Sequence, residues 1–227
     1  KSTGNGNLNL GCGMITNSTS LTAAIATGSS TVDATPVAAV GDIQDSDNWG
    51  GAELLPFTVK QTDPYEDVNP PPFTPCSGDN ASKITVGSNV TDNSRADASG
   101  VICAKDISIN GTADLGSATY VVDGGNFSAG AQSHITCDGC TIILTSSDTS
   151  TTPPIGTVTI NGGAEIDMSA PTSGTFDGIL FYQDRRAPES TTIVNKINGN
   201  SDSLMEGAFY FPKQQLQING TAGLNFN

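Results

Sequence analysis

The sequence is poor in positive charge. Nine Lys and Arg residues stand against 23 Asp and Glu residues, so the formal net charge is −14. A protein that binds nucleic acid neutralises phosphates with cationic side chains, and a protein that binds an anionic membrane surface needs the same kind of side chain. The charge balance therefore argues against both partners. We attribute the acidity to solubility outside the cell.

Long apolar runs are also missing from the sequence. No stretch approaches the roughly 18 consecutive apolar residues that indicate a membrane-spanning helix, so we expect no transmembrane segment in this chain. No secretory signal peptide is visible at Lys1. Aromatic residues make up only 6% of the chain, whereas there are 26 glycines. This composition is typical of many turns and short strands rather than of helices.

Catalytic motifs are scarce as well. His134 is the only histidine, no G-x-S-x-G motif occurs, and the glycine-rich stretches lack the strand–turn–helix context of a phosphate loop. We expect His134 to be an exposed corner residue. Asp184, Arg185 and Arg186 form the one acid–base cluster within a recognisable motif, and we expect Asp184 and Arg185 to pair at the end of a coil. A polysaccharide lyase or hydrolase would need clustered carboxylates on one face. The separation of carboxylates is a property of the fold, so this alternative stays open.

The sequence does contain an internal repeat. An Asn-Gly turn between apolar positions recurs at Ile109–Leu115, Ile160–Ile166, Ile197–Gly199 and Ile218–Leu224. A second, apolar strand type alternates with it, at Tyr120–Val122, Thr141–Leu144, Gly178–Tyr182 and Gly207–Phe211. Short strands at turn-punctuated intervals predict an all-β fold, a right-handed parallel β-helix (solenoid) in which each coil stacks on the next. We expect inward-facing ladders formed by Ile109, Val122, Ile143, Ile160, Ile179 and Ile218.

The repeat is interrupted once, over residues 44–82. Six prolines fall in this interval, and a proline lacks the N–H that a central strand must donate. We therefore expect the first coils before residue 44, a proline-rich loop excursion over 44–82, and further coils to the end of a single domain spanning 1–227. The excursion carries four aromatic residues that are either interaction anchors or covers for an open end or flank of the solenoid. These residues are Trp49, Phe57, Tyr65 and Phe73.

Acidic residues at the start of the excursion offer oxygen ligands. Asp42, Asp45 and Asp47 are of the type that Ca²⁺ prefers, but their spacing does not match the EF-hand loop. We interpret them as a solvated acidic loop, with calcium as the weaker alternative, and we expect no cofactor.

Three stretches of the second half carry a family resemblance. The motifs at 166–174, 178–185 and 207–212 resemble those of TadG-like proteins, which belong to the tight-adherence (Flp) pilus-assembly group of bacteria. The strong resemblance covers about residues 100–220. Asp63-Pro64-Tyr65 and the proline-rich run ending at Cys76 are also similar to this family, whereas the usual Pro-Gly is missing near Gly116.

The resemblance implies a function and a place in the cell. It implies a non-enzymatic structural or adhesive component of a tight-adherence pilus system, located outside the cell, on the bacterial surface or in the periplasm. The implied partners are other pilus or surface proteins, including further copies of this chain. Many relatives have an N-terminal membrane-anchoring segment, so this chain would start after that segment or have lost it.

Five cysteines complete the set of candidate residues. Cys137 and Cys140 form a C-x-x-C motif, but no second such motif or nearby His pair completes a zinc site. A secreted, loop-rich chain favours disulfides over metal binding. We predict Cys76–Cys103 as the first disulfide, which would tie the excursion to the solenoid, and Cys137–Cys140 as a local second one. Cys12 is then left free or paired outside the chain.

Overall fold

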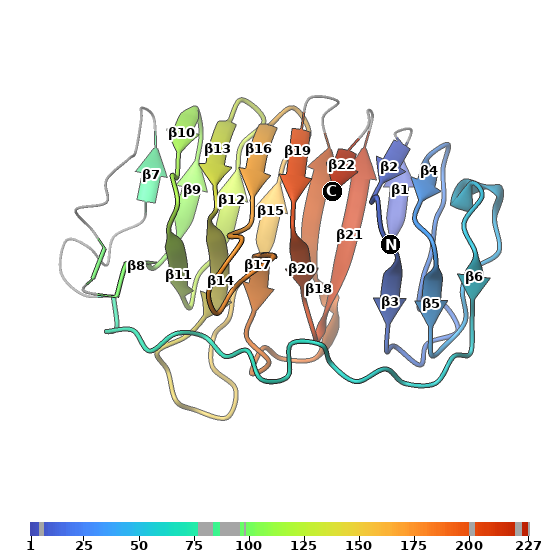
Figure 1. Cartoon of the computed structure of the whole chain (residues 1–227), viewed down its shortest axis with the longest axis horizontal. Coiled ribbons are helices and arrows are strands. Elements are labelled where there is room, and N and C mark those ends of the chain that lie inside the picture. The colour runs from blue at the N-terminus through green and yellow to red at the C-terminus, as the bar shows by residue number, and fades with distance from the viewer. Residues whose placement is uncertain are drawn as a thin grey trace.

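The fold consists of parallel β-sheets. The computed structural model describes residues 1–4, 7–76, 84–86, 96–97, 99–199, 203–220 and 224–226 (Figure 1). Within these residues, the named strands that pair do so in parallel, and the one named helix is the short 3₁₀ helix η1 (Asp47–Trp49). No helix among them has the length and hydrophobicity needed to cross a membrane. The arrangement is compatible with a β-helix or solenoid.

Two sheets have seven strands each. The first is ordered β1 (Ser2–Gly4), β21 (Gln214–Gly220), β18 (Ser190–Gly199), β15 (Val158–Ile160), β12 (Phe127–Ala129), β9 (Ile107–Ile109), β7 (Ile84–Val86). The second is ordered β10 (Thr112–Asp114), β13 (His134–Asp138), β16 (Glu165–Ser169), β19 (Ser203–Glu206), β22 (Leu224–Phe226), β2 (Asn7–Asn9), β4 (Thr31–Asp33).

The remaining strands form two smaller sheets. The five-stranded sheet is ordered β20 (Ala208–Tyr210), β17 (Ile179–Gln183), β14 (Thr141–Thr145), β11 (Thr119–Asp123), β8 (Val101–Ala104). The three-stranded sheet is ordered β3 (Met14–Thr16), β5 (Val37–Ala39), β6 (Leu54–Leu55). From β9 to β22 the chain visits the first, second and five-stranded sheets in rotation, as the predicted repeat requires.

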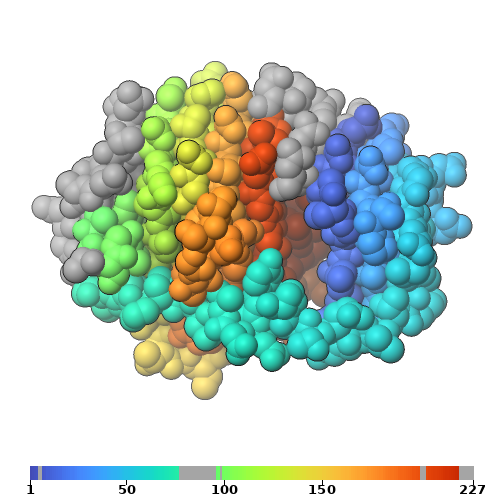
Figure 2. All heavy atoms as spheres, viewed as in Figure 1, coloured from blue at the N-terminus to red at the C-terminus, as the bar shows by residue number. Residues whose placement is uncertain are grey.

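The order of the strands in space differs from their order in the chain. β1 pairs with β21 and β2 pairs with β22, so the first strands of the chain stack against the last ones. Figure 1 shows both chain ends near the middle of the molecule, with β4 and β6 at one end and β7 and β8 at the other. The chain must therefore travel back along the molecule between β6 and β8. Residues 56–76, which we call the strap, make this return along one side (Figures 1 and 2).

The predicted excursion begins later than the sequence indicated. Trp49 and Leu54 both lie inside the predicted interval 44–82, yet η1 packs beside β4, and β6 pairs with β5. Trp49 is 4% exposed, and its indole N–H donates to the carbonyl of Gln44 at 2.7 Å. These residues continue the sheets because the prolines start only at Pro56. The predicted end of the excursion, residues 77–82, lies outside the described residues.

The main core is built from ladders of apolar residues. Ile109, Ala129, Ile160, Ile197 and Ile218 occupy paired positions on successive strands of the first sheet, and all are buried. These positions include the apolar residues that precede the Asn-Gly pairs, so the repeat in the sequence corresponds to one ladder. The predicted turns are wrong at two of these pairs, because Asn198-Gly199 and Asn219-Gly220 are the last residues of β18 and β21 and pair with each other. Burial of apolar area in such ladders stabilises the fold by roughly 25 cal/mol per Å².

A second apolar cluster lies on the other side of the five-stranded sheet. It contains Val101, Val121, Ile143, Phe176, Ile179 and Tyr182. Tyr65, Val68 and Phe73 of the strap pack against it. Every residue of β14 and of β17 is therefore buried, because the main core covers one face and the strap covers the other.

The predicted ladder is wrong at two of its six positions. Ile143 and Ile179 are buried, but they belong to the cluster under the strap rather than to the main core. Ile109, Val122, Ile160 and Ile218 do lie in the main core. A continuous apolar run such as Thr141–Leu144 has no alternation, so its pattern does not say which side chains face inward.

Candidate functional site

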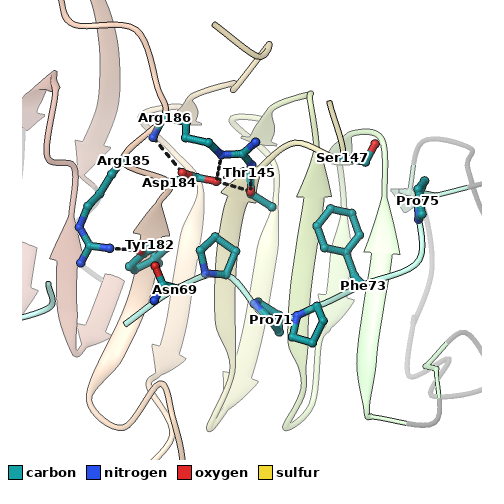
Figure 3. Close-up of a pocket in the computed structure, with 12 residues that line it drawn as sticks. Asn69, Pro71, Phe73, Pro75, Thr145, Ser147, Tyr182, Asp184, Arg185 and Arg186 are labelled. Atoms are coloured by element: carbon teal, nitrogen blue, oxygen red, sulfur yellow. Dashed lines mark hydrogen bonds and ion pairs between the residues drawn. The ribbon is translucent and has the colours of Figure 1, made fainter. Parts of the chain in front are cut away.

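A groove of about 450 Å³ lies between the strap and the ends of two strands of the five-stranded sheet (Figure 3). Its strap side is formed by Asn69, Pro70, Pro71, Pro72, Phe73 and Pro75. Its sheet side is formed by Thr145, Ser147, Tyr182, Asp184, Arg185 and Arg186. Figure 3 shows the ring of Phe73 pointing from the strap into the space below Ser147. The prolines fix φ in this part of the strap and favour an extended course along the groove.

Asp184 is the buried carboxylate at the groove. It follows β17 and is 4% exposed. Its Oδ2 accepts hydrogen bonds from the Thr145 hydroxyl at 2.6 Å and from the Arg186 guanidinium at 2.8 and 3.1 Å, and its Oδ1 accepts one from the Arg186 amide at 2.8 Å. Burial alone would raise the pKa of Asp184, but these hydrogen bonds outweigh it and lower the pKa below 3.8.

Arg186 links Asp184 to the loop that follows β14. Its guanidinium donates to the carbonyls of Asp148 and Ser146, each at 2.8 Å. The expected pairing of Asp184 with Arg185 is therefore wrong: Asp184 pairs with Arg186. Arg185 and Arg186 are adjacent in the sequence, and their side chains point in different directions in the turn (Figure 3).

Arg185 holds the strap. Its guanidinium pairs with Asp63 at 3.2 Å and donates to the carbonyl of Val68 at 2.8 Å and to the carbonyl of Tyr65. It also donates to the Tyr182 hydroxyl at 3.1 Å. A planar guanidinium with five donors suits this role because it can bind several acceptors of one segment at once.

Three tyrosines surround Arg185 and Asp63. The rings of Tyr182 and Tyr210 are stacked with centroids 5.1 Å apart, and Tyr65 meets Tyr210 edge to face at 5.4 Å. The Tyr210 hydroxyl donates to Asp63, and the Tyr182 hydroxyl donates to the carbonyl of Val68. Burial raises the pKa of Tyr182 to about 12. Burial would also raise the pKa of Asp63, but the hydrogen bonds from Tyr210, the Tyr65 amide and Arg185 lower it.

A third carboxylate, Asp123, binds the groove residue Ser147. Asp123 is 2% exposed, pairs with Lys105 at 2.6 Å, and accepts hydrogen bonds from the amide and hydroxyl of Ser147 at 2.6 and 2.9 Å. Burial would raise the pKa of Asp123, but these contacts lower it. Asp123 thereby fixes Ser147 at the groove wall.

Both predicted disulfides are present in the structure. Cys76 and Cys103 are bonded, with Cα atoms 5.6 Å apart, and join the end of the strap to β8. Cys137 and Cys140 are bonded across the turn that follows β13. Cys12 is exposed and not in a disulfide.

The structure does not gather the acidic residues that were considered for calcium. Among the described residues, one group of three potential metal ligands was found: Cys76, Cys103 and Asp123, whose ligand atoms lie within 4.8 Å of one another. Its two cysteines are already joined to each other. Asp42, Asp45 and Asp47 are not part of such a set, and Asp42 accepts a hydrogen bond from the Ile43 amide instead.

The four aromatic candidates of the excursion are found in different places. Trp49 is buried beside β4, and Phe57 is 66% exposed at the start of the strap. Tyr65 packs from the strap against Tyr210, and Phe73 lines the groove. Trp49, Tyr65 and Phe73 thus pack against the sheets, whereas Phe57 is exposed, and the choice between anchor and cover stays a prediction.

His134 lies within β13 rather than at a corner. Its Nδ1 is 3.1 Å from the carboxylate of Glu165 on the neighbouring strand β16, and both side chains are nearly half exposed. No described residue of the groove is a histidine. His134 therefore belongs to the outer face of the second sheet.

Sequence reasoning missed several residues of the groove. Thr145 and Ser147 gave no signal because Ser and Thr side chains are common in this chain. Asp63 was noticed only as part of the Asp63-Pro64-Tyr65 motif. Its partner Arg185 is 122 residues away, so their pairing depends on the path of the strap.

Comparisons with known proteins identify no relative. No protein-family model, no curated protein and no solved structure matches the chain.

Proposed function

We propose that this protein is a non-enzymatic extracellular component with a structural or adhesive role, associated with a tight-adherence (Flp) pilus system. In this proposal residues 1–227 form a single domain with the architecture of a right-handed parallel β-helix. The pairing of β1 with β21 and of β2 with β22 supports a single unit, because the first and last parts of the chain share sheets.

The observation that carries the proposal is the internal pairing of the charges at the groove. Asp184 is bound by Arg186 and Thr145, and Arg185 is bound by Asp63. A general base near neutral pH needs a pKa close to 7, whereas the pKa of Asp184 is lowered from an already acidic value. These groups support the fold and offer hydrogen bonds to a ligand, but they are poorly suited to moving a proton.

The two disulfides support a location outside the cytoplasm. Disulfides persist in oxidising compartments and are rare where cellular thiols keep cysteines reduced. The cell surface and the periplasm are therefore the proposed locations. The link to pilus assembly comes from the resemblance at 166–174, 178–185 and 207–212 alone.

A turnover assay tests the non-enzymatic part. The purified protein is incubated with a panel of acidic and neutral polysaccharides, and new reducing ends and unsaturated products are measured. We expect no turnover above that of a heat-denatured sample. Turnover that disappears in Asp184→Asn while the circular dichroism spectrum stays unchanged would overturn this part and support a polysaccharide lyase or hydrolase.

A cell assay tests the surface role. The gene is deleted in the organism that encodes it, and surface attachment is compared with that of the complemented strain. We expect attachment to fall on deletion and to return on complementation, and we expect pilus proteins to co-purify with the tagged protein after cross-linking. Unchanged attachment together with no co-purified pilus protein would contradict the proposal.

A further inference from the structure

We propose that the groove binds an uncharged saccharide unit. The inference rests on the adhesive role proposed above, for which it names the class of ligand. It draws on the charge of the groove, the chemistry of its two walls and the rigidity of its strap side.

The charge of the groove favours a neutral ligand. Arg186 is paired with Asp184, and Arg185 is paired with Asp63, so each positive charge at the groove is matched by a carboxylate 2.8 or 3.2 Å away. An anionic ligand would have to compete with a buried carboxylate for its arginine, and leaving Asp184 unpaired in a site that is 4% exposed is costly. A cationic ligand finds both carboxylates occupied in the same way. A ligand without charge disturbs neither pair.

The strap wall offers apolar faces and few donors. Pro70, Pro71 and Pro72 have no backbone N–H, so this stretch presents ring C–H faces and carbonyl acceptors. The Phe73 ring points into the groove beside them (Figure 3). A saccharide ring has an apolar C–H face that can lie on an aromatic ring, and hydroxyl groups around its edge that can donate to carbonyls.

The sheet wall offers polar groups at fixed positions. The side chain of Arg186 is 40% exposed, and among the described residues its Nη1 donates one hydrogen bond, to the carbonyl of Asp148. A second N–H on the same nitrogen can therefore donate to a ligand. The Ser147 hydroxyl donates to Asp123 and keeps its oxygen as an acceptor. This mixture of one apolar wall and a few directed polar groups is typical of small-molecule sites, which span about 300–1,000 Å³.

The strap side is held in place before any ligand arrives. Arg185 binds the carbonyls of Tyr65 and Val68 on one side of the groove, and the Cys76–Cys103 disulfide fixes the strap on the other. A wall that is already ordered loses little entropy on binding, and this preorganisation raises affinity. The groove thus lies between two anchors of the strap.

A binding experiment with the intact chain tests the inference. Neutral trisaccharides (maltotriose, cellotriose, chitotriose and mannotriose) are titrated into the isotopically labelled protein and followed by NMR, with a galacturonate trimer and a proline-rich peptide as alternative ligands. We expect at least one neutral trisaccharide to bind with a Kd of about 1 mM or tighter. We also expect it to shift the amide signals of Asn69, Phe73 and Ser147.

Matched variants locate the binding. Phe73→Ala should weaken the Kd about tenfold, whereas Phe57→Ala, which removes an exposed aromatic residue of the strap outside the groove, should leave the Kd within about twofold. Asn69→Ala is a second groove variant at an exposed position, so it tests the site without removing a ring from the strap packing.

Each outcome decides the inference. Binding of only the galacturonate trimer or only the peptide overturns it, as does a shift pattern outside the groove, an equal effect of Phe57→Ala, or no binding of any neutral trisaccharide. Its failure is separate from failure of the proposed function: a protein required for attachment that binds no saccharide overturns this inference alone. Turnover of a bound saccharide overturns the non-enzymatic role and leaves the site in place.

Discussion

Arg185 and Asp63 form an ion pair at 3.2 Å across 122 residues of sequence. Asp63 belongs to the strap, and Arg185 follows β17 in the five-stranded sheet. The strap covers an apolar sheet face that would otherwise meet water, and it connects the two ends of the molecule. The pair therefore joins a connecting segment to the sheet that it protects.

We predict that Arg185→Ala loosens the strap. The substitution removes the partner of Asp63 and the donor to two strap carbonyls, and hydrogen bonds that involve a charged group contribute about 1.5–3 kcal/mol each. Because Arg185 and Asp63 are partly exposed, we expect a loss of about 2 kcal/mol in the free energy of unfolding. Urea unfolding measures it, and limited proteolysis should cut the strap faster.

Lys60→Ala is the control for this change. Lys60 is an exposed cation on the strap, and its removal should alter the free energy of unfolding by less than about 0.5 kcal/mol. Equal effects of the two variants would mean that Arg185 does not anchor the strap.

The two disulfides should differ in their contribution to stability. Cys76 and Cys103 are 27 residues apart, whereas Cys137 and Cys140 are separated by three. Restricting the unfolded chain by the longer loop is worth about 3.5 kcal/mol in the chain-entropy model, against about 2 kcal/mol for the shorter loop. We expect the Cys76→Ala/Cys103→Ala variant to lose more stability than the Cys137→Ala/Cys140→Ala variant.

Thermal unfolding of the two double variants measures this difference, and a non-reduced digest analysed by mass spectrometry checks the pairings. Linked peptides should carry Cys76 with Cys103 and Cys137 with Cys140. A larger loss on removing the local disulfide would show that strain or packing, not loop closure, decides the effect.

Gly125 should tolerate no side chain. A Cβ at this position would overlap the backbone oxygen of Lys105, which follows the neighbouring strand β8. A Cβ at Gly51 would meet no atom within 4 Å. We expect Gly125→Ala to lower the free energy of unfolding by about 3 kcal/mol and Gly51→Ala to change it by less than about 0.5 kcal/mol. Chemical denaturation of both variants is the measurement, and a fully stable Gly125→Ala protein would mean that the strands are not stacked this closely.

The periodic part of the fold could be predicted from the sequence. Ile109, Ile160, Ile197 and Ile218 each precede an Asn-Gly pair and occupy one ladder, because the same buried position recurs in each repeat. The stacking of β1 on β21 could not be predicted in this way. The two strands are far apart in the sequence and share no motif. Any exposed strand edge of suitable length could pair with β1 or with β21.

The groove was less predictable than the ladders. The sequence singled out Asp184 and Arg186. It did not show which arginine pairs with Asp184, because Arg185 and Arg186 leave the turn in different directions. The sequence pattern did not show which face of the sheet Ile143 occupies, because the strap buries the second face of β14. The local sequence pattern around Ile143 does not indicate that Phe73, which lies 70 residues earlier in the sequence, packs over the same sheet face.

Tyr182 should titrate late. Burial raises its pKa from 10.0 to about 12, so the folded protein keeps this proton at a pH at which the unfolded chain loses it. Its contribution to stability is therefore complete below pH 10 and is lost as the pH rises toward 12. Burial also raises the pKa values of Tyr65 and Tyr210. Spectrophotometric titration of the wild type should therefore show Tyr65, Tyr182 and Tyr210 ionising above the ordinary pKa of 10.0, and Tyr182→Phe should remove a late-titrating group rather than an early one.

Acid should weaken the anchors of the groove. The pKa of Asp184 is lowered from 3.8 by its hydrogen bonds with Arg186 and Thr145, and the pKa values of Asp63 and Asp123 are also lowered. In the interval below pH 3.8 the unfolded chain binds protons that the folded protein does not, so stability rises with pH there. The contribution of these carboxylates is present above the unfolded pKa and is lost as the pH falls through the lower, folded values.

Thermal unfolding between about pH 6 and about pH 2 tests this dependence. The wild-type Tm should fall as the pH drops below 3.8, and Asp184→Asn should show a flatter profile together with a loss of about 2–3 kcal/mol at neutral pH, where the ionised carboxylate is absent. Asp148→Asn is the control, because the Asp148 side chain is exposed and Arg186 uses its backbone carbonyl rather than its carboxylate. A profile for Asp184→Asn as steep as that of the wild type would mean that other carboxylates govern the acid transition.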